Sequence, residues 1–582
     1  MTDVLHLEQP EDAHSQAEWE AATAAVLRKA RRLTDSDPDD AVWAKLTRRT
    51  LDGIEMPPLG LASERLDPDA VRPTRAGAWD IRSLVALAEP KAANETVLAE
   101  LAGGATSIWL HADADTDIEA TLAGVFCDLA PVVLDSPTSA LASAEALIET
   151  AIDGLHPATN FGFDPLGAML RDIPLAVDEA VAELQAVGGL ADSHGVRGIV
   201  VDATAAHDLG ASDVQELGWS IAVGAAYLRW LVDHGLDVVA AACVMEFRYA
   251  ATDDQFATIA KLRAARQIWA RVLRASGAEA PMAVHAVTSR PMLSKYDPHT
   301  NMLRATVAAF AAGVGGADAV SVLPFDSSLG MPSDLGRRIA RNLNHLLIDE
   351  SHVAVVADPA GGAYAVERLT ADLAAAGWAA FTELEGEWTG ANQTGSHDFS
   401  AFVARVEATV QARDAQIATR RRPITGLSEF PNLAETLPQR APDPLNDAVR
   451  RYGAPFERLR DEPAPTRVFL ATMGPVAAHT ARATFASNLF AAGGVGVDVA
   501  GATTGPDDLV AAWSGQPVVC LAGADAAYAE WGQAAATALR QAGATRVVIA
   551  GAATDYADDN CAMGVHALDF LARTRAAGLM EP

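Results

Sequence analysis

Short apolar runs alternate with segments of helical periodicity through the middle of the chain, between residues 105 and 359. Apolar strands separated by amphipathic helices are typical of a parallel sheet with crossover helices. A weaker strand near residues 160–167 brings the count to about eight, the number that closes a barrel. The other runs are ATSIWLHA (105–112), APVVLDSP (130–137), GIVVDA (198–203), DVVAAACVMEF (237–247), MAVHAVTS (282–289), ADAVSVLPF (317–325) and HVAVVADP (352–359).

The helix predicted after the DVVAAACVMEF run shows the periodicity well. Its apolar residues fall on one stripe, and its basic residues lie mostly on other faces. Thr252 and Asp253 precede it and are expected to cap it. The apolar residues are Phe256, Ile259, Leu262, Ile268, Trp269, Val272 and Leu273, and the basic ones are Lys261, Arg263, Arg266 and Arg271.

The pattern changes after residue 395 to a charged helix and Pro-punctuated segments, and a second strand-helix series begins near residue 466. Its strands are expected at TRVFLATMG, GVGVDVAG, QPVVCLAG and TRVVIAG, with a last helix near HALDFLARTRAAG. We therefore predict an α/β protein in which a (β/α)8 TIM barrel precedes a small doubly wound domain. The predicted divisions are an N-terminal helical and extended arm (1–45), the barrel (46–395), a belt (396–464) and the second domain (465–582).

Composition narrows the possible partners and compartments. A formal charge of -32 over 582 residues disfavours binding to nucleic acid or to anionic membranes. The four cysteines form no C-x-x-C pair, which suits a reducing compartment. The N-terminus lacks the basic and apolar stretches of a signal peptide, and no apolar window is long enough to span a bilayer. We expect a cytoplasmic protein with no membrane or nucleic-acid partner.

Several motifs resemble those of the adenosylcobalamin-dependent methylmalonyl-CoA mutases. They are IAKLRAARQIWARV (259–272), the run from Asp297 to Asn342, and VADPAGGAY (356–364). RRRPITGLSEFPN (420–432) and TLDGIEMPPLG (50–60) resemble the small subunits of heterodimeric bacterial members in particular. The resemblance implies an acyl-CoA barrel followed by a flavodoxin-like, cobalamin-binding type of domain.

The resemblance also implies a cobalt-binding loop D-x-H-x-x-G after the first strand of the last domain. Here Val476 stands at the Asp position, Ala477 at the following position and Ala478 at the His position. His479 lies one place late, and residues 463–497 contain no Asp or Glu to orient it. It is either a shifted cobalt ligand or a polar residue in the first turn of a helix, and the missing partner favours the second interpretation. No metal site is expected.

The predicted barrel also lacks side chains that catalytic members of the family use to bind substrate. In catalytic members a Tyr-His pair precedes an acidic residue and a Gly, and the His donates to the thioester carbonyl. By resemblance Thr204 and Ala205 stand at those two positions, and a methyl group donates no hydrogen bond. Leu84 and Gly77 stand where catalytic members have a substrate-binding Tyr and Arg, and Ser327 replaces a Glu.

Two other features have more than one interpretation. His285, on a predicted barrel strand, is either a satisfied interior residue or the remnant of a substrate pocket. Asp113, Asp115 and Asp117 have the spacing of a calcium loop, but the turn Gly and the final Glu are missing, which favours a solvated loop.

Two hypotheses of function follow. In the first, the chain is a non-catalytic small subunit that forms a heterodimer with a large mutase subunit, and the large subunit alone binds adenosylcobalamin. In the second, it is a divergent but active acyl-CoA mutase or another acyl-CoA barrel enzyme. The joint substitutions at Leu84, Thr204, Ala205, Val476 and Ala478 favour the first hypothesis.

Overall fold

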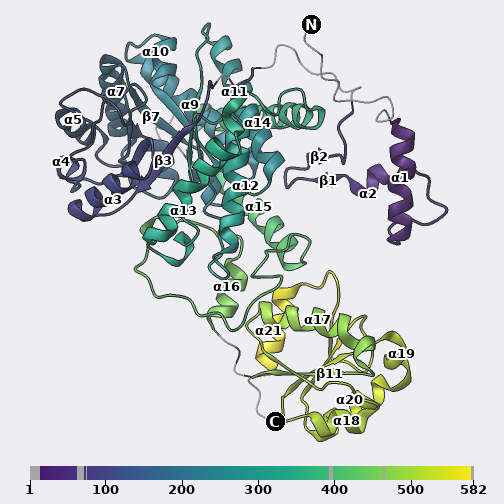
Figure 1. Ribbon diagram of the computed structural model, residues 1–582. Coiled ribbons are helices and arrows are strands. Elements are labelled where there is room, and N and C mark those ends of the chain that lie inside the picture. Colours follow the sequence, from purple (N-terminus) through teal and green to yellow (C-terminus); the bar gives the residue numbers. More distant parts are fainter. Residues whose placement is uncertain are drawn as a thin grey trace.

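The computed structural model describes residues 14–61, 71–73, 75–391, 398–462, 464 and 466–578. A barrel and a smaller α/β domain are joined by a mixed helical and extended segment, and a helical arm lies beside the barrel (Figure 1). The predicted fold class is therefore confirmed. The N-terminal stretch 1–13 and the predicted boundaries at residues 395/396 and 465 lie outside the described residues.

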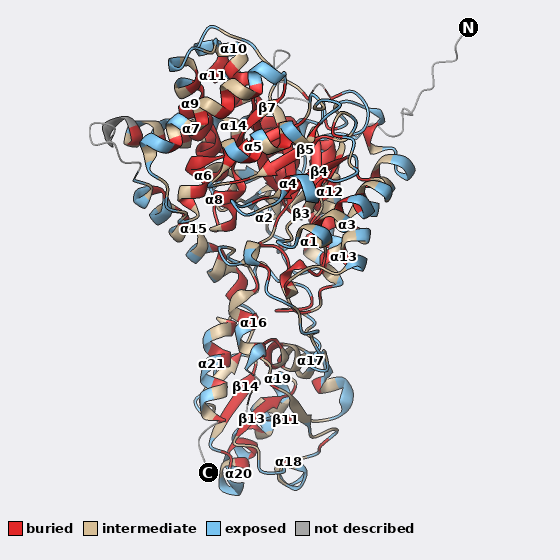
Figure 2. Ribbon diagram, turned by 90° about the vertical axis from the view of Figure 1, so that its left-hand side faces the viewer, coloured by how far each residue is buried: buried red, intermediate tan, exposed pale blue. Residues whose placement is uncertain are grey.

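Eight parallel strands close the barrel, with the last strand pairing with the first. Most of their residues are buried, which explains why the strands are recognisable as continuous apolar runs (Figure 2). The strands are β3 (Asp80–Val85), β4 (Ser107–His111), β5 (Val132–Asp135), β6 (Asn160–Phe163), β7 (Arg197–Asp202), β8 (Met245–Ala251), β9 (Ala283–Thr288) and β10 (Ala319–Ser321).

One predicted strand is wrong and another was not predicted. The HVAVVADP run forms a short 3-10 helix, η4 (Val353–Val355), followed by turns on the protein surface. The missing strand is β3, whose sequence DIRSLV mixes charged and apolar residues because it places Arg82 inside the barrel. The DVVAAACVMEF run also divides, since α10 (Val238–Cys243) is helical and β8 begins only at Met245.

Helices surround the barrel in the order that crossover connections require. They include α3 (Pro90–Ala102), α4 (Ile118–Thr121), α5 (Ala140–Thr150), α6 (Pro165–Leu170), α7 (Val177–His194), α8 (Thr204–Asp208), α9 (Asp213–Asp233), α11 (Gln255–Ala275), α12 (Thr300–Val314), α13 (Asp334–His345) and the long α14 (Tyr364–Ala391).

Helix α11 differs from the prediction at its cap. The N-cap is Asp254, which makes no side-chain capping bond, and the expected cap Thr252 bonds to Thr258. The basic residues Lys261, Arg263 and Arg266 are buried, because other elements supply carboxylates to them. These carboxylates are Glu216 of α9, Glu367 of α14 and Asp318.

The N-terminal arm has its own small core. Helix α1 (Gln16–Lys29) begins with a capping box and packs against α2 (Ala41–Leu46), with Trp19 and Trp43 in contact. A short hairpin, β1 (Arg48–Arg49) and β2 (Glu55–Met56), then leads towards the barrel. The belt includes α15 (Ser400–Ala418) and α16 (Ala454–Asp461), so the predicted charged helix near its start is confirmed.

The C-terminal domain is a five-stranded parallel sheet in the order β12-β11-β13-β14-β15. This is the strand order 2-1-3-4-5 of flavodoxin-like folds. The strands are β11 (Val468–Thr472), β12 (Val497–Val499), β13 (Val518–Ala522), β14 (Arg546–Ala550) and β15 (Asp559–Cys561). The helices are α17 (Val476–Ala492), α18 (Pro506–Ala512), α20 (Gln533–Ala542) and α21 (Ala567–Ala577), with short turns α19 (Asp525–Ala527) and η6 (Tyr528–Gly532) before α20. The polar edge strand β15 was not predicted, because it has no apolar run.

Candidate functional site

A cavity of about 330 Å³ opens at the carboxyl ends of the barrel strands, where barrel enzymes place their sites. Thr204 begins α8 and lines this cavity, whereas Ala205 is fully buried behind it. Leu84, on β3, lines a separate and smaller pocket. The structure therefore does not bring the three barrel positions implied by the resemblance into one cavity.

Charged side chains from neighbouring strands pair with one another in the cavity. Asp202, at the end of β7, accepts hydrogen bonds from Arg171 at 2.9 Å and from Arg248 at 3.2 Å. Thr204 also donates to Asp202, at 2.5 Å. Burial would raise the pKa of Asp202, but the two guanidinium groups outweigh it and lower that pKa. Asp202 therefore neutralises two arginines at the mouth, but one terminal nitrogen of Arg248 and the indole nitrogen of Trp109, which also lines the cavity, have no hydrogen-bond partner among the described residues.

His285 is a satisfied interior residue. Its Nδ1 accepts from Arg248 at 3.3 Å, and its Nε2 lies 2.8 Å from the hydroxyl of Ser321. Burial, together with nearby Arg82 and Arg248, lowers its pKa well below the usual value, so the ring is neutral near pH 7. The Nε2–H therefore donates to Ser321, which leaves neither ring nitrogen free.

A second layer of charges lies towards the amino ends of the strands. Arg82 bonds to Glu246 across the barrel at 2.8 Å and to Asp80 at 3.1 Å. Arg197 is 3.8 Å from the other oxygen of Glu246. Burial alone would lower the pKa of Arg82, but the two carboxylates outweigh it, and the guanidinium stays charged. Ion pairs therefore occupy much of the barrel interior.

Asp164 behaves differently from its neighbour Asp202. Burial and the adjacent carboxylate of Asp202 raise its pKa to about 7, although the Tyr227 hydroxyl donates to it at 2.5 Å. Burial also raises the pKa of Asp208. Sequence reasoning did not single out these carboxyl groups. The contacts that raise the pKa of Asp164 and lower that of Asp202 form only when the barrel has closed.

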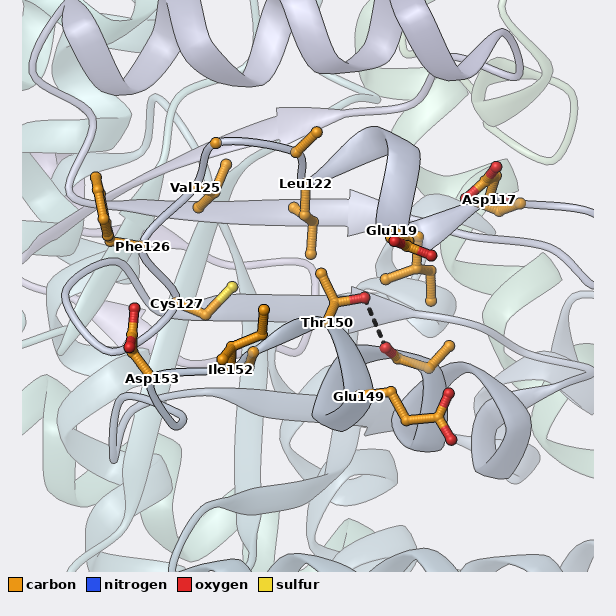
Figure 3. A pocket seen from close by; sticks show the side chains of 16 residues that line it. Asp117, Glu119, Leu122, Val125, Phe126, Cys127, Glu149, Thr150, Ile152 and Asp153 are labelled. Atoms are coloured by element: carbon orange, nitrogen blue, oxygen red, sulfur yellow. Dashed lines mark hydrogen bonds between the residues drawn. The ribbon is translucent and has the colours of Figure 1, made fainter.

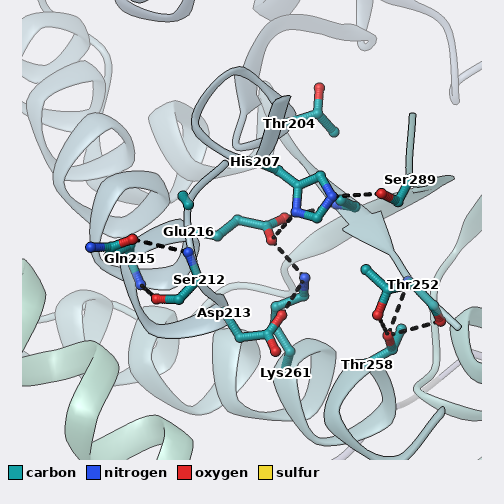
Figure 4. A network of polar contacts seen from close by, with 12 residues as sticks. Thr204, His207, Ser212, Asp213, Gln215, Glu216, Thr252, Thr258, Lys261 and Ser289 are labelled. Atoms are coloured by element: carbon teal, nitrogen blue, oxygen red, sulfur yellow. Dashed lines mark hydrogen bonds and ion pairs between the residues drawn. The ribbon is translucent and has the colours of Figure 1, made fainter. Parts of the chain in front are cut away.

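A buried polar network holds the segment that carries Thr204 (Figure 4). Lys261, fully buried on α11, bonds to Glu216 at 2.6 Å and to Asp213 at 2.9 Å. His207 contacts the hydroxyl of Ser289 at 2.7 Å and lies 3.5 Å from Glu216. Because these contacts tie α8, α9, α11 and the loop after β9 together, this side of the mouth is rigid.

The belt crosses the mouth of the barrel. The amide of Arg450 donates to the carbonyl of Asp208 at 2.9 Å, and that of Tyr452 donates to the carbonyl of Pro291 at 2.9 Å. Pro444, Leu445 and residues 447–449 of the same segment line the cavity. The belt therefore lies over the end of the barrel that holds the cavity. The Pro-rich sequence gave no signal of this position.

In the C-terminal domain, Val476, Ala477 and Ala478 form the first turn of α17 after a three-residue loop. His479 follows them in the same turn and is only 5% exposed. Its Nδ1 donates to the carbonyl of Gly474 at 3.2 Å. Fixing the ring in this way needs no carboxylate partner.

A larger groove lies elsewhere, between α4 and the end of α5 (Figure 3). It has a volume of about 750 Å³, and its lining includes four carboxylates but no His, Lys or Arg. Its single cysteine, Cys127, has a pKa raised by burial and so is a poor nucleophile. This groove carries no catalytic constellation.

Within the described residues, no three His, Cys, Asp or Glu side chains are grouped to hold a metal ion. No helix among them is long and apolar enough to cross a membrane.

The barrel and the sheet order together define a (β/α)8 barrel protein that carries a flavodoxin-like domain. The family model for methylmalonyl-CoA mutase matches residues 191–480. The chain is 43% identical to the methylmalonyl-CoA mutase small subunit of Streptomyces virginiae, over 94% of this chain and 93% of that protein. It is 38% identical to a probable small subunit of Mycobacterium tuberculosis, over 92% of each chain.

The chain belongs to the methylmalonyl-CoA mutase family, a family of cobalamin-dependent isomerases. It is also similar to a large subunit, that of Porphyromonas gingivalis, with 31% identity over 44% of this chain and 35% of that protein. Relatives are thus named as both small and large subunits.

Proposed function

We propose that this chain is the non-catalytic small subunit of a heterodimeric methylmalonyl-CoA mutase. Its large partner subunit binds adenosylcobalamin and interconverts (R)-methylmalonyl-CoA and succinyl-CoA by a radical rearrangement. In this proposal Leu84, Thr204 and Ala205 are degenerate substrate positions, and Val476, Ala477 and Ala478 are degenerate cofactor positions. The observation that carries it is that the protein's own charges pair with one another inside the barrel.

The barrel supports the proposal because the two positions that would hold a thioester donor do not offer one. Ala205 is buried and has no donor, and Thr204 is engaged with Asp202 and Arg171. Stabilising the charge that develops on a thioester oxygen needs a donor held at that oxygen. Residues 444–449 also cover the mouth, where a cofactor-bearing domain would need access.

The C-terminal domain supports it because its first loop does not fit a cobalamin. A cobalt ligand needs its nitrogen at an open surface wide enough for the corrin ring, and His479 is almost fully buried against its own helix. Its neighbours in the helical turn, Ala477 and Ala478, have only methyl side chains. We therefore assign the cofactor to the large subunit and none to this chain.

The names of the relatives support the choice of partner, since small and large subunits of one enzyme imply a heterodimer. We place the pair in the cytoplasm because all four cysteines are free, which suits a reducing compartment. The arm α1–α2, which has its own core and only a few contacts with the barrel, is a candidate to hold the partner.

The test is to express this chain and the homologous large chain from the same source, separately and together. We expect the two to co-purify, and we expect mutase activity only where the large chain is present. His479→Ala in this chain should leave the activity of the pair unchanged. Conversion of (R)-methylmalonyl-CoA by this chain alone with adenosylcobalamin would overturn the proposal in favour of a divergent active mutase.

A further inference from the structure

The segment from His352 to Tyr364 has the apolar sequence of a buried strand but lies on the surface. Val355 is 77% exposed and Val356 is 57% exposed, and Tyr364 is also exposed. Leu346, on the neighbouring π-helical turn η3 (Leu346–Glu350), is half exposed. Consecutive exposed apolar side chains are costly in a soluble protein unless another surface covers them.

This segment is not a loose loop, because a small core holds it from beneath. Ala360 and Val366 are buried together with Ile259 of α11 and with Ala311 and Val314 of α12. Val353, which precedes the exposed valines, packs against the same cluster, so the backbone is held on both sides of them.

In addition to the apolar contacts, buried ion pairs hold the same segment in place. Arg263 pairs with Asp358 and, at 2.7 Å, with Glu367, and both carboxylates also pair with Arg72. The amide of Gly362 donates to Glu367 at 2.9 Å. A surface that is held rigid before binding loses little entropy when a partner covers it.

The charge of the segment indicates the kind of partner. Asp358 is its only acidic residue, and two arginines neutralise it, so the patch is neutral on a chain of net charge -32. A neutral apolar patch fits a protein surface of the same kind, and it fits neither a polyanion nor a cationic segment. A second copy of this chain would bring its own excess of negative charge.

The patch adjoins the segment that follows the hairpin β1–β2. A Cβ at Gly60 would lie 2.4 Å from the amide nitrogen of Ala365, so this segment packs directly on the start of α14. Leu59, beside it, is partly exposed. The arm α1–α2, which we assign to partner binding, is joined to this segment by the hairpin β1–β2.

We infer that residues 353–364, together with residues 59–60 after the hairpin, form a preformed docking surface for the large mutase subunit. The inference rests on the proposed function and assigns the location of its interface. Val355 and Val356 are its anchors.

The test compares two double variants of the full chain, each co-expressed with the large subunit. Val355→Asp/Val356→Asp should weaken the heterodimer by on the order of 100-fold, measured by sedimentation of the purified pair. The matched control is Phe126→Asp/Ile152→Asp, at exposed apolar residues of the groove in Figure 3, where Ile152 is 92% exposed. It should pair like the wild type. Because all four positions are exposed, each variant alone should unfold at the wild-type temperature.

Hydrogen exchange can locate the interface on the wild-type chain, without substitutions. Adding the large subunit should slow exchange of amides in residues 353–364 and leave those of residues 149–153 unchanged. Full-affinity pairing by the Val355→Asp/Val356→Asp variant, or no protection of residues 353–364, would overturn the inference while leaving the proposed function standing. Failure of the wild-type chains to pair would overturn both. A dimer of this chain alone that the same variant disrupts would assign the surface to a second copy and also overturn the inference.

Discussion

The two domains are stabilised in opposite ways. The barrel interior contains ion pairs, such as Arg82 with Glu246 and Arg248 with Asp202. The sheet of the C-terminal domain is apolar across its buried layer, with Leu470 and Val548 as typical members. Removing either partner of a buried ion pair destabilises the fold, because the other charge stays buried without compensation. An apolar layer is destabilised when side-chain volume is lost and a cavity remains.

The comparison also bears on function. A binding site needs polar groups that are left unsatisfied until the ligand arrives. In the barrel, Arg82 and His285 already have partners within the chain, whereas the indole nitrogen of Trp109 and one nitrogen of Arg248 have none in the described part of the chain. The barrel has therefore kept a polar interior in which ion pairs contribute to its own stability. Four predictions test this contrast, from the largest expected effect to the smallest.

Removing one partner from the barrel should be the most damaging change. Glu246→Ala leaves Arg82 buried without its cross-barrel partner, and we expect a loss of about 3–5 kcal/mol in the free energy of unfolding. Chemical denaturation of the full chain measures it. Adding Arg82→Met to that variant should restore part of the stability, and a double variant as unstable as the single one would contradict the ion-pair account.

Removing volume from the sheet should cost somewhat less. Leu470→Ala creates a cavity in the middle of the buried layer, and we expect a loss of about 3 kcal/mol. Because no charge is involved, the loss should be the same at low and high salt. A loss that changes strongly with salt would show that electrostatics also hold this domain.

The buried Asp164 should make the barrel less stable as the pH rises. Its pKa in the folded protein, about 7, lies above its ordinary value of 3.8, so the folded state binds this proton more tightly than the unfolded chain does. The resulting stability is fully present below about pH 3.8 and is lost as the pH rises through about 7.

Asp164→Asn keeps a neutral side chain of the same size and removes this titration. Between about pH 4.5 and 6.5, the stability of the wild type relative to the variant should fall by about 1.4 kcal/mol per pH unit. Asp52, whose pKa burial raises to about 6, is present in both proteins and cancels. Parallel pH profiles would mean that Asp164 is ionised throughout.

An exposed ion pair should matter least. Arg467 bonds to Asp498 at 2.7 Å on the surface of the C-terminal domain, and both side chains are largely exposed to solvent. Arg467→Ala should change the free energy of unfolding by less than about 1 kcal/mol. A loss as large as that of Glu246→Ala would remove the distinction between buried and exposed pairs.

The apolar strands of both domains could be predicted because continuous β-branched runs are buried on both faces of a parallel sheet. Strand β3 could not, since Asp80 and Arg82 interrupt its apolar pattern and only the closed barrel supplies Glu246 as their partner. The run at residues 353–357 was mistaken for a strand because its apolar composition is that of a buried strand, although Val355 and Val356 are exposed.

The sequence could predict the chemistry of individual site positions but not how these positions are arranged in space. The sequence indicates that Ala205 and Ala478 lack functional side chains, but the placement of Leu84 in a different pocket from Thr204 depends on the closed barrel. The position of the belt over the mouth could not be predicted either. It is held by backbone hydrogen bonds, such as that from the amide of Arg450 to the carbonyl of Asp208, and these do not depend on residue type.

The central claim is that this chain binds no cobalamin and serves a partner that does. The most direct measurement is a spectroscopic titration of the folded chain, without its partner, with adenosylcobalamin. We predict no saturable change in the cofactor spectrum at concentrations that saturate the large subunit. Saturable binding with a cobalt spectrum that changes in His479→Ala would contradict the account.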